Sequence, residues 1–506
     1  MTAPAPVRAR VVLRNPKSSK HHRGHGHGHG RGGGPVSSGS ARLRGAWLER
    51  RELIALVASC ILFLYAVTSL VIHSVLVRST PGGSADLDPL GVDGYEPDDG
   101  GDNSEGGEDP GWERLDGRDE ERKKKKRNRG GGGKNRIDDD GTDLDASYPR
   151  IRAEYDAKFP SDDRERMIEF ARSLRKREYV PIEGESMPYD VNDCPSAPPE
   201  GYPMAWPVLD VLENWNPDDA TPRARIYQGL CRFDAATEYD KALTYRKAEL
   251  PFVIRDDPVV LPTVERWNQP EYLTRILGRT ATYRSDYAET NHLMFFRTKN
   301  LKRVPEGWKE PTTERDISYP DWLEKARRAD EEEWEPDHPH WYFRLNGKSR
   351  DGRGYLFEEL PFFRPRENFY MIDPTDARGI NCRFGMRGNT AENHFDGSRN
   401  FIALFGGERR YFLSHPGQCP NLALYPARHP SGRHSAVNWA DPDLERYPQF
   451  ERALVNEVVL QGGDVLYLPT NWFHHIVSLN TNFQCNARSG MTDHYLSEIR
   501  ECGFKA

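Results

Sequence analysis

The distribution of apolar residues divides the chain into a polar N-terminal stretch, one long apolar run and a large region of mixed short patterns. The run, residues 53–77 (LIALVASCILFLYAVTSLVIHSVLV), contains no charged residue. A helix of about 20 apolar residues spans the roughly 30 Å hydrocarbon core of a bilayer. A buried core helix is the alternative, but the flanking segments lack the apolar positions that would cover one. We therefore expect a transmembrane signal-anchor helix, which begins too late and runs too long for a cleaved signal peptide.

Helical and strand-like patterns begin near residue 147 and fill the rest of the chain. Residues 148–179 place apolar side chains at helical spacing over one or two helices, and a proline-rich linker follows at 194–207. Further helices are expected at 264–278 and 318–334, and strand-like patterns at 250–260, 281–289, 291–297 and 340–347. We treat residues 147–250 as a helical and linker lead-in and residues 251–506 as the main domain.

The pattern changes again from Asn381 onward, where short strand-like runs are separated by Gly, Pro and Asn turns. Many short strands at this spacing are typical of a sandwich or a barrel and not of a parallel sheet. We detect no internal repeat. The expected fold class is therefore mainly β with flanking helices.

Charged residues of one sign cluster in the segments that flank the apolar run. Residues 1–52 contain glycine and histidine repeats with eleven Lys or Arg against two Glu. Residues 78–146 carry fifteen carboxylates against two arginines between Asp86 and Glu121, and then a basic run, RKKKKRNRGGGGKNR. Such compositions cannot bury enough apolar surface to fold, so we expect a disordered tail and a disordered stalk. The basic run resembles a nuclear-localisation patch, but it lacks stacking aromatic residues, and the net charge of −7 predicts no nucleic-acid partner.

Basic residues predict the orientation of the apolar run in the membrane. Arg42, Arg44, Arg50 and Arg51 precede it, whereas only Arg78 follows closely. The positive-inside rule then keeps the N-terminus in the cytosol. The chain is expected to be a single-pass type II membrane protein whose main domain lies in the lumen of the endoplasmic reticulum or Golgi. The first 48 residues are acid-poor and Arg-bearing, so an organelle transit peptide is the alternative.

Six cysteines would face that oxidising lumen. They are Cys194, Cys231, Cys382, Cys419, Cys485 and Cys502. None forms a C-x-x-C pair, which argues against a zinc ribbon or a thioredoxin motif, and six thiols allow fifteen pairings between which the sequence does not choose. One observation counts mildly against a lumenal address, because residues 78–506 contain no N-x-S/T glycosylation site.

Candidate metal ligands are found in two strand-like segments. His394 and Asp396 are two residues apart, so they project from the same face of a strand. Downstream, a Gly-Gly-Asp turn starts the strand VLYLP, and a short loop leads to a second strand with His474 at its head. His475 follows, and neighbouring strand residues face opposite sides, so at most one of the two can point inward. An H-x-D triplet alone is expected about once by chance in this chain, and its simplest reading is an ordinary His–Asp pair.

Three longer segments carry a family resemblance. Residues 394–416 (HFDGSRNFIALFGGERRYFLSHP), 429–450 and 462–479 resemble, in order and spacing, the cupin-type JmjC dioxygenases, nearest to the asparaginyl hydroxylase branch that modifies a hypoxia-responsive transcription factor. The resemblance covers residues 381–490 well and extends more weakly back to about residue 250. It implies a double-stranded β-helix of the cupin or jelly-roll type, with Fe(II), 2-oxoglutarate and O₂. Two imidazoles and one carboxylate are the ligand set of such oxygenases.

The resemblance also implies roles for individual residues. His394, Asp396 and His474 match the iron ligands; Asn400, Asn486 and Tyr342 match residues that contact the co-substrate. Arg409 stands where that branch has a lysine for the distal carboxylate of 2-oxoglutarate, and an arginine can bind a carboxylate with two parallel hydrogen bonds. The assisting threonine is replaced by Ala391. A solvated strand arginine is the alternative reading of Arg409.

Substrate recognition departs further from that branch. Its arginine–glutamine pair, which holds the target amide, corresponds to Arg433 and His434 here, so recognition of asparagine becomes doubtful. An ordinary polar loop is the alternative reading of these two residues. The branch's C-terminal dimerisation helices have no counterpart before Ala506, so the oligomeric state stays open.

The sequence thus favours a membrane-anchored dioxygenase that hydroxylates, or by the same chemistry demethylates, a protein side chain. The expected partners are a protein or peptide substrate and a lipid bilayer. Two alternatives remain: a catalytically silent cupin that only binds a partner, and a cupin with another metal that acts on a small molecule. All three share one expected fold.

Overall fold

The computed structural model describes residues 136–504 except 139–140, 183–186, 300, 302, 333–337 and 350. The predicted tail, the predicted span at 53–77 and most of the predicted stalk lie outside these residues. Within the described part of the chain, no helix combines the length and the hydrophobicity that crossing a bilayer requires.

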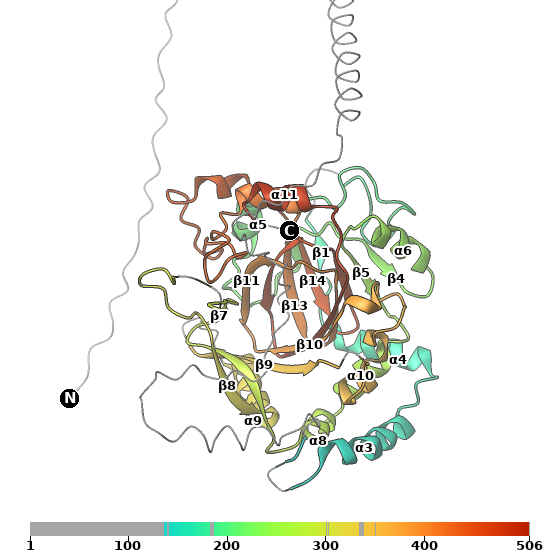
Figure 1. Cartoon of the computed structure of the whole chain (residues 1–506). Coiled ribbons are helices and arrows are strands. Elements are labelled where there is room, and N and C mark those ends of the chain that lie inside the picture. Colours follow the sequence, from blue (N-terminus) through green and yellow to red (C-terminus); the bar gives the residue numbers. More distant parts are fainter. Residues whose placement is uncertain are drawn as a thin grey trace, which may run out of the picture. The chain divides into compact units, whose positions relative to one another are not determined.

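Two large sheets form the centre of the domain (Figure 1). The first has nine strands in the order β4 (Arg232–Asp234), β5 (Phe252–Arg255), β15 (Val465–Leu468), β12 (Asn400–Gly406), β17 (Asn482–Ser489), β10 (Ala377–Gly385), β9 (His340–Gly347), β6 (Thr282–Ala288) and β8 (Thr313–Ser318). The second has six, in the order β2 (Trp206–Pro207), β14 (Leu454–Gln461), β13 (Glu408–Ser414), β16 (Phe473–Ser478), β11 (Thr390–Phe395) and β7 (His292–Leu293). A small parallel pair, β1 (Val180–Pro181) and β3 (Arg225–Ile226), stands apart. The prediction of a mainly β domain with flanking helices is confirmed at this level.

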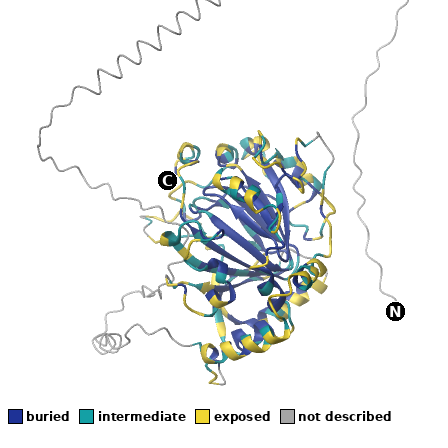
Figure 2. Cartoon of the chain, turned by 90° about the vertical axis from the view of Figure 1, so that its right-hand side faces the viewer, coloured by how far each residue is buried: buried dark blue, intermediate teal, exposed yellow. Residues whose placement is uncertain are grey.

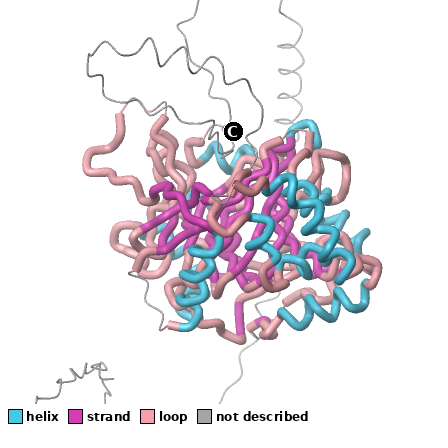
Figure 3. Tube along the Cα trace, turned by 90° about the horizontal axis from the view of Figure 1, so that it is seen from below, coloured by secondary structure: helices cyan, strands magenta, loops and turns pink. Residues whose placement is uncertain are grey.

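Helices cover the outside of the sheets, as Figures 2 and 3 show by the buried strands in the centre and the more exposed helices around them. They are α3 (Leu144–Lys158), α4 (Arg164–Leu174), α5 (Val208–Asn214), α6 (Tyr239–Lys247), α7 (Leu261–Trp267), α8 (Tyr272–Leu277), α9 (Tyr319–Glu331), α10 (Tyr355–Glu359) and α11 (Leu496–Glu501). The predicted helix over 264–278 is two helices, because the chain turns between Trp267 and Tyr272, where Pro270 removes a backbone donor.

Alternation along the strands decides which side chains enter the space between the sheets. On β12, Phe401 and Phe405 join the apolar cluster under the helices, whereas Ile402 and Leu404 belong to a separate cluster with Tyr411. This second cluster fills part of the interior with Leu413, Leu466, Leu468 and Trp472, among others. The remaining interior space is lined by polar and apolar side chains and forms the cavity described below.

The predicted lead-in contributes strands as well as helices. Its strands β2 and β4 pair with β14 and β5 in the two main sheets. Glu359 of α10 is completely buried and accepts hydrogen bonds from Tyr148 of α3 (2.6 Å), Tyr272 of α8 (2.7 Å) and Trp267 of α7 (2.8 Å). The first helix is therefore bound to the domain by a buried carboxylate.

The folded part also starts earlier than the predicted boundary at residue 147. Arg136 stacks over the ring of Tyr355 at 3.3 Å and donates to the carbonyl of Ile276 at 2.9 Å. The carboxylate of Asp138 accepts hydrogen bonds from the backbone of Arg279 (3.0 Å) and Thr280 (3.1 Å). The described residues of the predicted stalk's end thus pack against the domain.

All six cysteines outside the predicted span are paired. The disulfides are Cys194–Cys231, Cys382–Cys485 and Cys419–Cys502. The second links β10 to β17, whose residues 382 and 485 are register partners. One of the fifteen pairings that the sequence allowed is thereby selected.

Candidate metal centre

His394 and His474 lie directly opposite each other on two neighbouring strands. They are register partners in the antiparallel pair of β11 and β16, and their ring centroids are 4.2 Å apart. The pairing of β11 shifts between Ala391 and His394, as at a β-bulge, so local irregularity sets the direction of His394. His475 points to the other face, where its ring stacks on Trp439 at 4.9 Å. The prediction that only one of the adjacent histidines faces inward is confirmed, and it is His474.

Asp396 completes the group. Its Oδ2 lies 3.9 Å from Nε2 of His474, and one ligand atom from each of His394, Asp396 and His474 falls within 4.8 Å of the others. The segment before His474 is joined to the segment of Asp396 by a hydrogen bond, because the backbone N–H of Asn471 donates to the carbonyl of Asp396 at 2.8 Å. Asn471 has a φ of +66°. Asparagine tolerates this left-handed conformation better than most residues.

Hydrogen bonds orient both imidazoles. Nδ1 of His394 lies 2.7 Å from the carbonyl oxygen of Glu392, and Nδ1 of His474 lies 3.1 Å from that of Trp472. A carbonyl oxygen only accepts, so Nδ1 carries the proton in each ring and donates it. The lone pairs are then on the Nε2 atoms, which is the arrangement that metal-binding histidines show.

Burial and neighbouring charges set the protonation states of the three residues. Burial lowers the pKa of His394 well below its ordinary value and also lowers that of His474, so both rings are neutral. Burial alone would raise the pKa of Asp396, but the Arg488 guanidinium holds it below its usual range. Two neutral imidazoles and one ionised carboxylate are therefore ready to ligate a cation.

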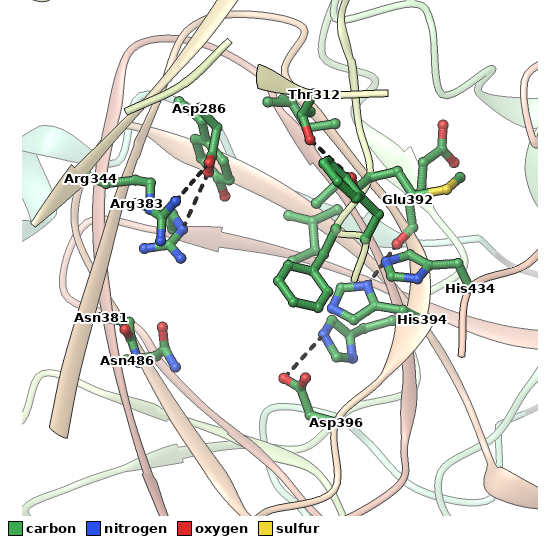
Figure 4. A pocket seen from close by; sticks show the side chains of 18 of the residues that line it. Asp286, Thr312, Arg344, Asn381, Arg383, Glu392, His394, Asp396, His434 and Asn486 are labelled. Carbon is green, nitrogen blue, oxygen red and sulfur yellow. Dashed lines mark hydrogen bonds and ion pairs between the residues drawn. The ribbon is translucent and has the colours of Figure 1, made fainter. Parts of the chain in front are cut away.

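These three side chains open into a cavity of about 650 Å³ between the sheets. Figure 4 shows His394 and Asp396 on one side of it and Asn381, Asn486, Arg344 and Arg383 facing them. The volume falls in the range usual for small-molecule sites. It leaves room for a bound small molecule and for part of a second ligand.

Most of the residues predicted to bind the co-substrate or the substrate line this cavity. Tyr342, Asn400 and Asn486 belong to its wall, as do Arg433 and His434. Asn486 donates from Nδ2 to Oδ1 of Asn400 at 3.0 Å, so the two asparagines act as a pair. Arg433 has a φ of +71°, a strained conformation that proteins often keep at functional sites.

Arg409, unlike the other residues predicted to bind the co-substrate, does not line the cavity. Its side chain is completely buried, and it is not among the residues that line the cavity. It donates from Nη1 to the hydroxyl of Tyr342 at 2.8 Å and from Nη2 to the carbonyl of Arg383 at 2.7 Å. The guanidinium thus stands behind the wall of the cavity and contacts residues of that wall.

Two of the wall residues that were not predicted from the sequence lie on β17. Gln484 and Arg488 lie on β17 at two-residue spacing from Asn486, so all three face the cavity. Arg488 donates from Nη2 to Oδ2 of Asp396 at 2.6 Å. The two-residue period of a strand, counted from Asn486, is the signal that would have found them.

A second group of charged residues lies next to the metal ligands. His292 of β7 lies 2.6 Å through Nδ1 from Oε1 of Glu392 and 3.5 Å through Nε2 from Oδ1 of Asp218. Despite the opposing effect of burial, these carboxylates raise the pKa of His292 to about 10, so it is a cation at neutral pH. It fastens β7 to β11, the strand that carries His394.

Comparison with known proteins agrees with the ligand geometry. Residues 241–488 match the family described as "Cupin-like domain". Residues 241–488 form a cupin-like domain of the JmjC oxygenase type. The match identifies the family of the domain and no particular branch of it, so the asparaginyl hydroxylase branch is not specifically supported.

Individual relatives match over shorter lengths. The chain is 28% identical over 131 residues to "Lysine-specific demethylase JMJ31" of Arabidopsis thaliana, an alignment that covers 24% of each chain. It is 32% identical over 154 residues to "Lysine-specific demethylase 8" of Danio rerio (28% of this chain and 36% of that protein). It is 40% identical over 118 residues to "tRNA wybutosine-synthesizing protein 5" of Mus musculus (23% and 33%). The chain therefore spans about a quarter to a third of the length of these relatives.

Proposed function

We propose that the protein is a dioxygenase that uses Fe(II), 2-oxoglutarate and O₂ to hydroxylate a protein side chain or to demethylate one. The observation that carries this proposal is the convergence of His394, Asp396 and His474 in the wall of the cavity. Two imidazoles and one carboxylate leave coordination positions open for a co-substrate and O₂.

The ligand set fits a divalent metal ion in chemistry as well as in position. Both Nε2 lone pairs are unprotonated because the Nδ1 atoms donate to backbone carbonyls. The carboxylate is ionised, and a metal ligand must be deprotonated. The opening toward the cavity distinguishes the site from a closed structural metal site.

The charge of the cavity also fits a dianionic co-substrate. Five arginines and five carboxylates line it: Arg284, Arg344, Arg383, Arg433, Arg488, Asp286, Glu310, Glu314, Glu392 and Asp396. These ten formal charges cancel, and the lowered pKa values of His394, His434 and His474 keep the imidazoles neutral. A divalent cation then gives the cavity a net charge of +2, which 2-oxoglutarate neutralises.

The residues of this chain would bind and orient the co-substrate and the substrate, and would exclude water from the site. Fe(II) with 2-oxoglutarate and O₂ supplies the oxidation, in which one oxygen atom enters a C–H bond and 2-oxoglutarate becomes succinate and CO₂. In this proposal Tyr342, Asn400 and Asn486 orient the co-substrate, and Arg433 and His434 contact the substrate beside His394; all of them line the cavity. An N-methyl group hydroxylated in this way is lost as formaldehyde, so hydroxylation and demethylation need the same site.

The names of the relatives and the residue at position 434 both bear on the substrate class. The names of the relatives include demethylases and a protein of tRNA modification. His434, whose ring stacks on that of His394 at 4.9 Å, replaces the glutamine that would hold a target amide. We therefore propose a protein side chain and do not favour asparagine among the candidates.

The function is tested by the release of CO₂ from 2-oxoglutarate labelled at C1. The full-length purified chain is incubated with Fe(II), ascorbate and candidate peptides, and we expect release that depends on Fe(II). Asp396→Ala should abolish it. His475→Gln is the matched control, because the neighbouring histidine faces away from the cavity. Absence of Fe(II)-dependent release in the unaltered protein would favour a silent binding module.

We further propose that residues 53–77 anchor the protein in a membrane and that the catalytic domain lies in the lumen of the secretory pathway. The apolar run, with arginines on its N-terminal side, supports the anchor and its orientation. The three disulfides support an oxidising compartment, because such bonds form and persist there and are rare in the cytosol.

Protease protection of intact vesicles tests whether the domain lies in the lumen. The domain should resist added protease until detergent opens the vesicles, and alkylation before reduction should leave its six cysteines unmodified. Digestion of the domain without detergent would contradict a lumenal position. A domain in the lumen of another organelle would separate from secretory vesicles on fractionation.

A further inference from the structure

Two arginines lie side by side in the wall of the cavity. Arg383 of β10 and Arg344 of β9 are register partners, and both side chains line the cavity. Like charges directly opposite each other on neighbouring strands destabilise a sheet. Burial and the Arg383 guanidinium accordingly lower the pKa of Arg344. An anion bound beside the two guanidinium groups would relieve this repulsion.

The carboxylates nearby are shared unequally between the two arginines. Nη1 of Arg344 donates to Oδ1 of Asp286 at 2.9 Å and to Oε1 of Glu314 at 2.8 Å. The other oxygen of Glu314 accepts from Nε of Arg284 at 3.2 Å. Within the part of the chain that the structure describes, the nearest carboxylate to Arg383 is that of Asp286, whose Oδ2 lies 3.9 Å from Nε (Figure 4). These three arginines and two carboxylates leave an excess of one positive charge, and Arg383 has the weakest ion pair among them.

Most donors of Arg383 are available to a ligand. Nη1 donates to the carbonyl of the adjacent Cys382 at 3.2 Å, whereas Nε and Nη2 make no hydrogen bond of ordinary length to any described residue. The side chain is 22% exposed although it belongs to the cavity wall. A guanidinium can donate two parallel hydrogen bonds to one carboxylate. Arg383 therefore offers the cavity an arginine fork without a close counter-charge.

The other carboxylates of the wall are already paired with other basic groups or lie at the surface. Glu310 is exposed. The remaining pairs are Asp396 with Arg488, Glu392 with His292, and both Asp286 and Glu314 with Arg344. The described wall thus supplies no close carboxylate for Arg383, and a ligand can supply one.

Arg383 and the metal ligands face the same space. Arg383 is the register partner of Gln484 on β17, and Arg488, which binds Asp396, follows four residues later on that strand. Four residues of a strand span about 13 Å. Figure 4 shows Arg383 across the cavity from His394. A side chain held by Arg383 therefore lies between this guanidinium and the metal ligands.

We propose that Arg383 binds the carboxylate of the substrate residue that is oxidised, so that this residue is an aspartate or a glutamate. The inference rests on the proposed function and names its substrate class. A carboxylate supplies the one negative charge that the group of five side chains lacks, whereas a phosphate, with a charge of about −1.5 to −2, would exceed it. A methylated lysine would bring a further cation to the two arginines, so the inference selects hydroxylation over demethylation.

The rest of the wall and the reaction are compatible with such a residue. Leu293, Ile402 and Ile476 line the same cavity and suit the methylene groups of an acidic side chain. One atom of O₂ enters a C–H bond of that side chain, and the other enters succinate as 2-oxoglutarate loses CO₂. No further reductant is required.

Affinity selection from peptide libraries tests the charge preference. The full-length chain, with Mn(II) and 2-oxoglutarate but without O₂, is offered equimolar libraries in which degenerate positions flank one fixed residue. The fixed residue is aspartate, glutamate, asparagine, glutamine, trimethyl-lysine or phosphoserine, and mass spectrometry counts the retained peptides. We expect an acidic residue to be enriched about tenfold or more over its amide, as for hydrogen bonds to a charged group.

Substitutions of Arg383 assign the preference to this side chain. Arg383→Gln should abolish the enrichment, and Arg383→Glu should reverse it in favour of trimethyl-lysine. Arg378→Gln is the matched control, because Arg378 is an exposed residue of the same strand outside the cavity, and it should retain the enrichment. Circular dichroism checks folding. With Fe(II) and O₂, fragmentation of the retained peptides should place the added oxygen atom on the fixed acidic residue.

The outcomes separate this inference from the proposed function. Equal retention of acidic and amide libraries, a preference for trimethyl-lysine or phosphoserine, or an enrichment that persists in Arg383→Gln would show that the inference is wrong. The same holds if Arg383→Gln weakens 2-oxoglutarate in calorimetry with Mn(II), since Arg383 would then belong to the co-substrate site. If the unaltered protein with Mn(II) does not bind 2-oxoglutarate, the proposed function itself fails, and the inference with it.

Discussion

Arg488 donates a hydrogen bond to Asp396 across 2.6 Å, and it does so to Oδ2, the oxygen that lies 3.9 Å from Nε2 of His474. A charged arginine therefore holds the carboxylate of the candidate metal centre from within the cavity. Both side chains are largely buried, with 15% and 6% of their surfaces exposed. The pair orients the carboxylate and lowers its pKa at the same time.

Replacing this arginine should weaken metal binding. Loss of a partner that orients a metal ligand typically costs 10–100-fold in metal affinity. We expect Arg488→Met to lower the affinity for Mn(II) about tenfold or more, and Arg488→Lys to recover part of it. Electron paramagnetic resonance of free Mn(II) during titration measures the affinity. Equal affinities in Arg488→Met and the unaltered protein would show that Asp396 needs no such support.

The sequence was sufficient for those parts of the site that depend on local spacing. Two-residue alternation placed His394 with Asp396 and turned His474 inward while His475 faces Trp439. The same rule, counted from Asn486, applies to Gln484 and Arg488, which were missed because the resemblance singled out only Asn486 on β17. Local periodicity and the family resemblance together therefore identified the candidate metal ligands, but not the full wall of the cavity.

Features that depend on long-range pairing could not be predicted. The lead-in strand β4 joins the nine-stranded sheet beside β5, and His292 meets Glu392 a hundred residues away. Arg409 was expected to bind the co-substrate because the resemblance places it at the lysine of the related branch, yet its donors are used on Tyr342 and Gln484 from neighbouring strands. Such contacts arise from the packing of segments that are distant in sequence, and no short pattern records them.

The ion pairs of His292 predict a pH dependence of stability. Its pKa in the folded protein is about 10, against an ordinary value of 6.5. A group whose pKa is raised by folding stabilises the protein fully below its unfolded pKa, and this contribution is lost as the pH rises through the folded pKa. Stability should therefore fall between pH 6.5 and pH 10.

Urea unfolding of the unaltered protein and His292→Asn measures this contribution. The difference in unfolding free energy should be largest at or below pH 6.5 and should shrink steadily toward pH 10. His494→Asn, at an exposed histidine, serves as the control and should show no such trend. A difference that stays constant over this range would mean that His292 is not held as a cation by Asp218 and Glu392.

The disulfide between Cys194 and Cys231 closes a loop across a sequence separation of 37 residues. A cross-link of this kind stabilises mainly by restricting the unfolded chain, by about 2–4 kcal/mol. We expect the double variant Cys194→Ala/Cys231→Ala to lose about that much in urea unfolding. A reductant should destabilise the unaltered protein more than this variant. If the variant unfolds at the same urea concentration as the unaltered protein, the two cysteines do not pair.

Glu359 is expected to be the most sensitive residue for the attachment of α3. Its carboxylate lies among Tyr148, Tyr272 and Trp267, and the guanidinium of Arg266 is 3.5 Å away. Burial alone would raise its pKa, but the arginines and these hydrogen bonds keep the group ionised. Removing one partner of a buried charge pair typically costs about 3–5 kcal/mol, because the other charge stays buried.

We therefore expect Glu359→Gln to lower the free energy of unfolding by about 3 kcal/mol or more and to expose α3 to protease before the rest of the domain. The adjacent Glu358→Gln is the matched control. Glu358 is 57% exposed and pairs with Arg364 at the surface, so its replacement should change stability by less than about 0.5 kcal/mol. Equal effects of the two substitutions, or an α3 that stays protected in Glu359→Gln, would show that apolar packing alone attaches this helix. Urea unfolding gives the first quantity, and limited proteolysis with mass spectrometry identifies the first site of cleavage.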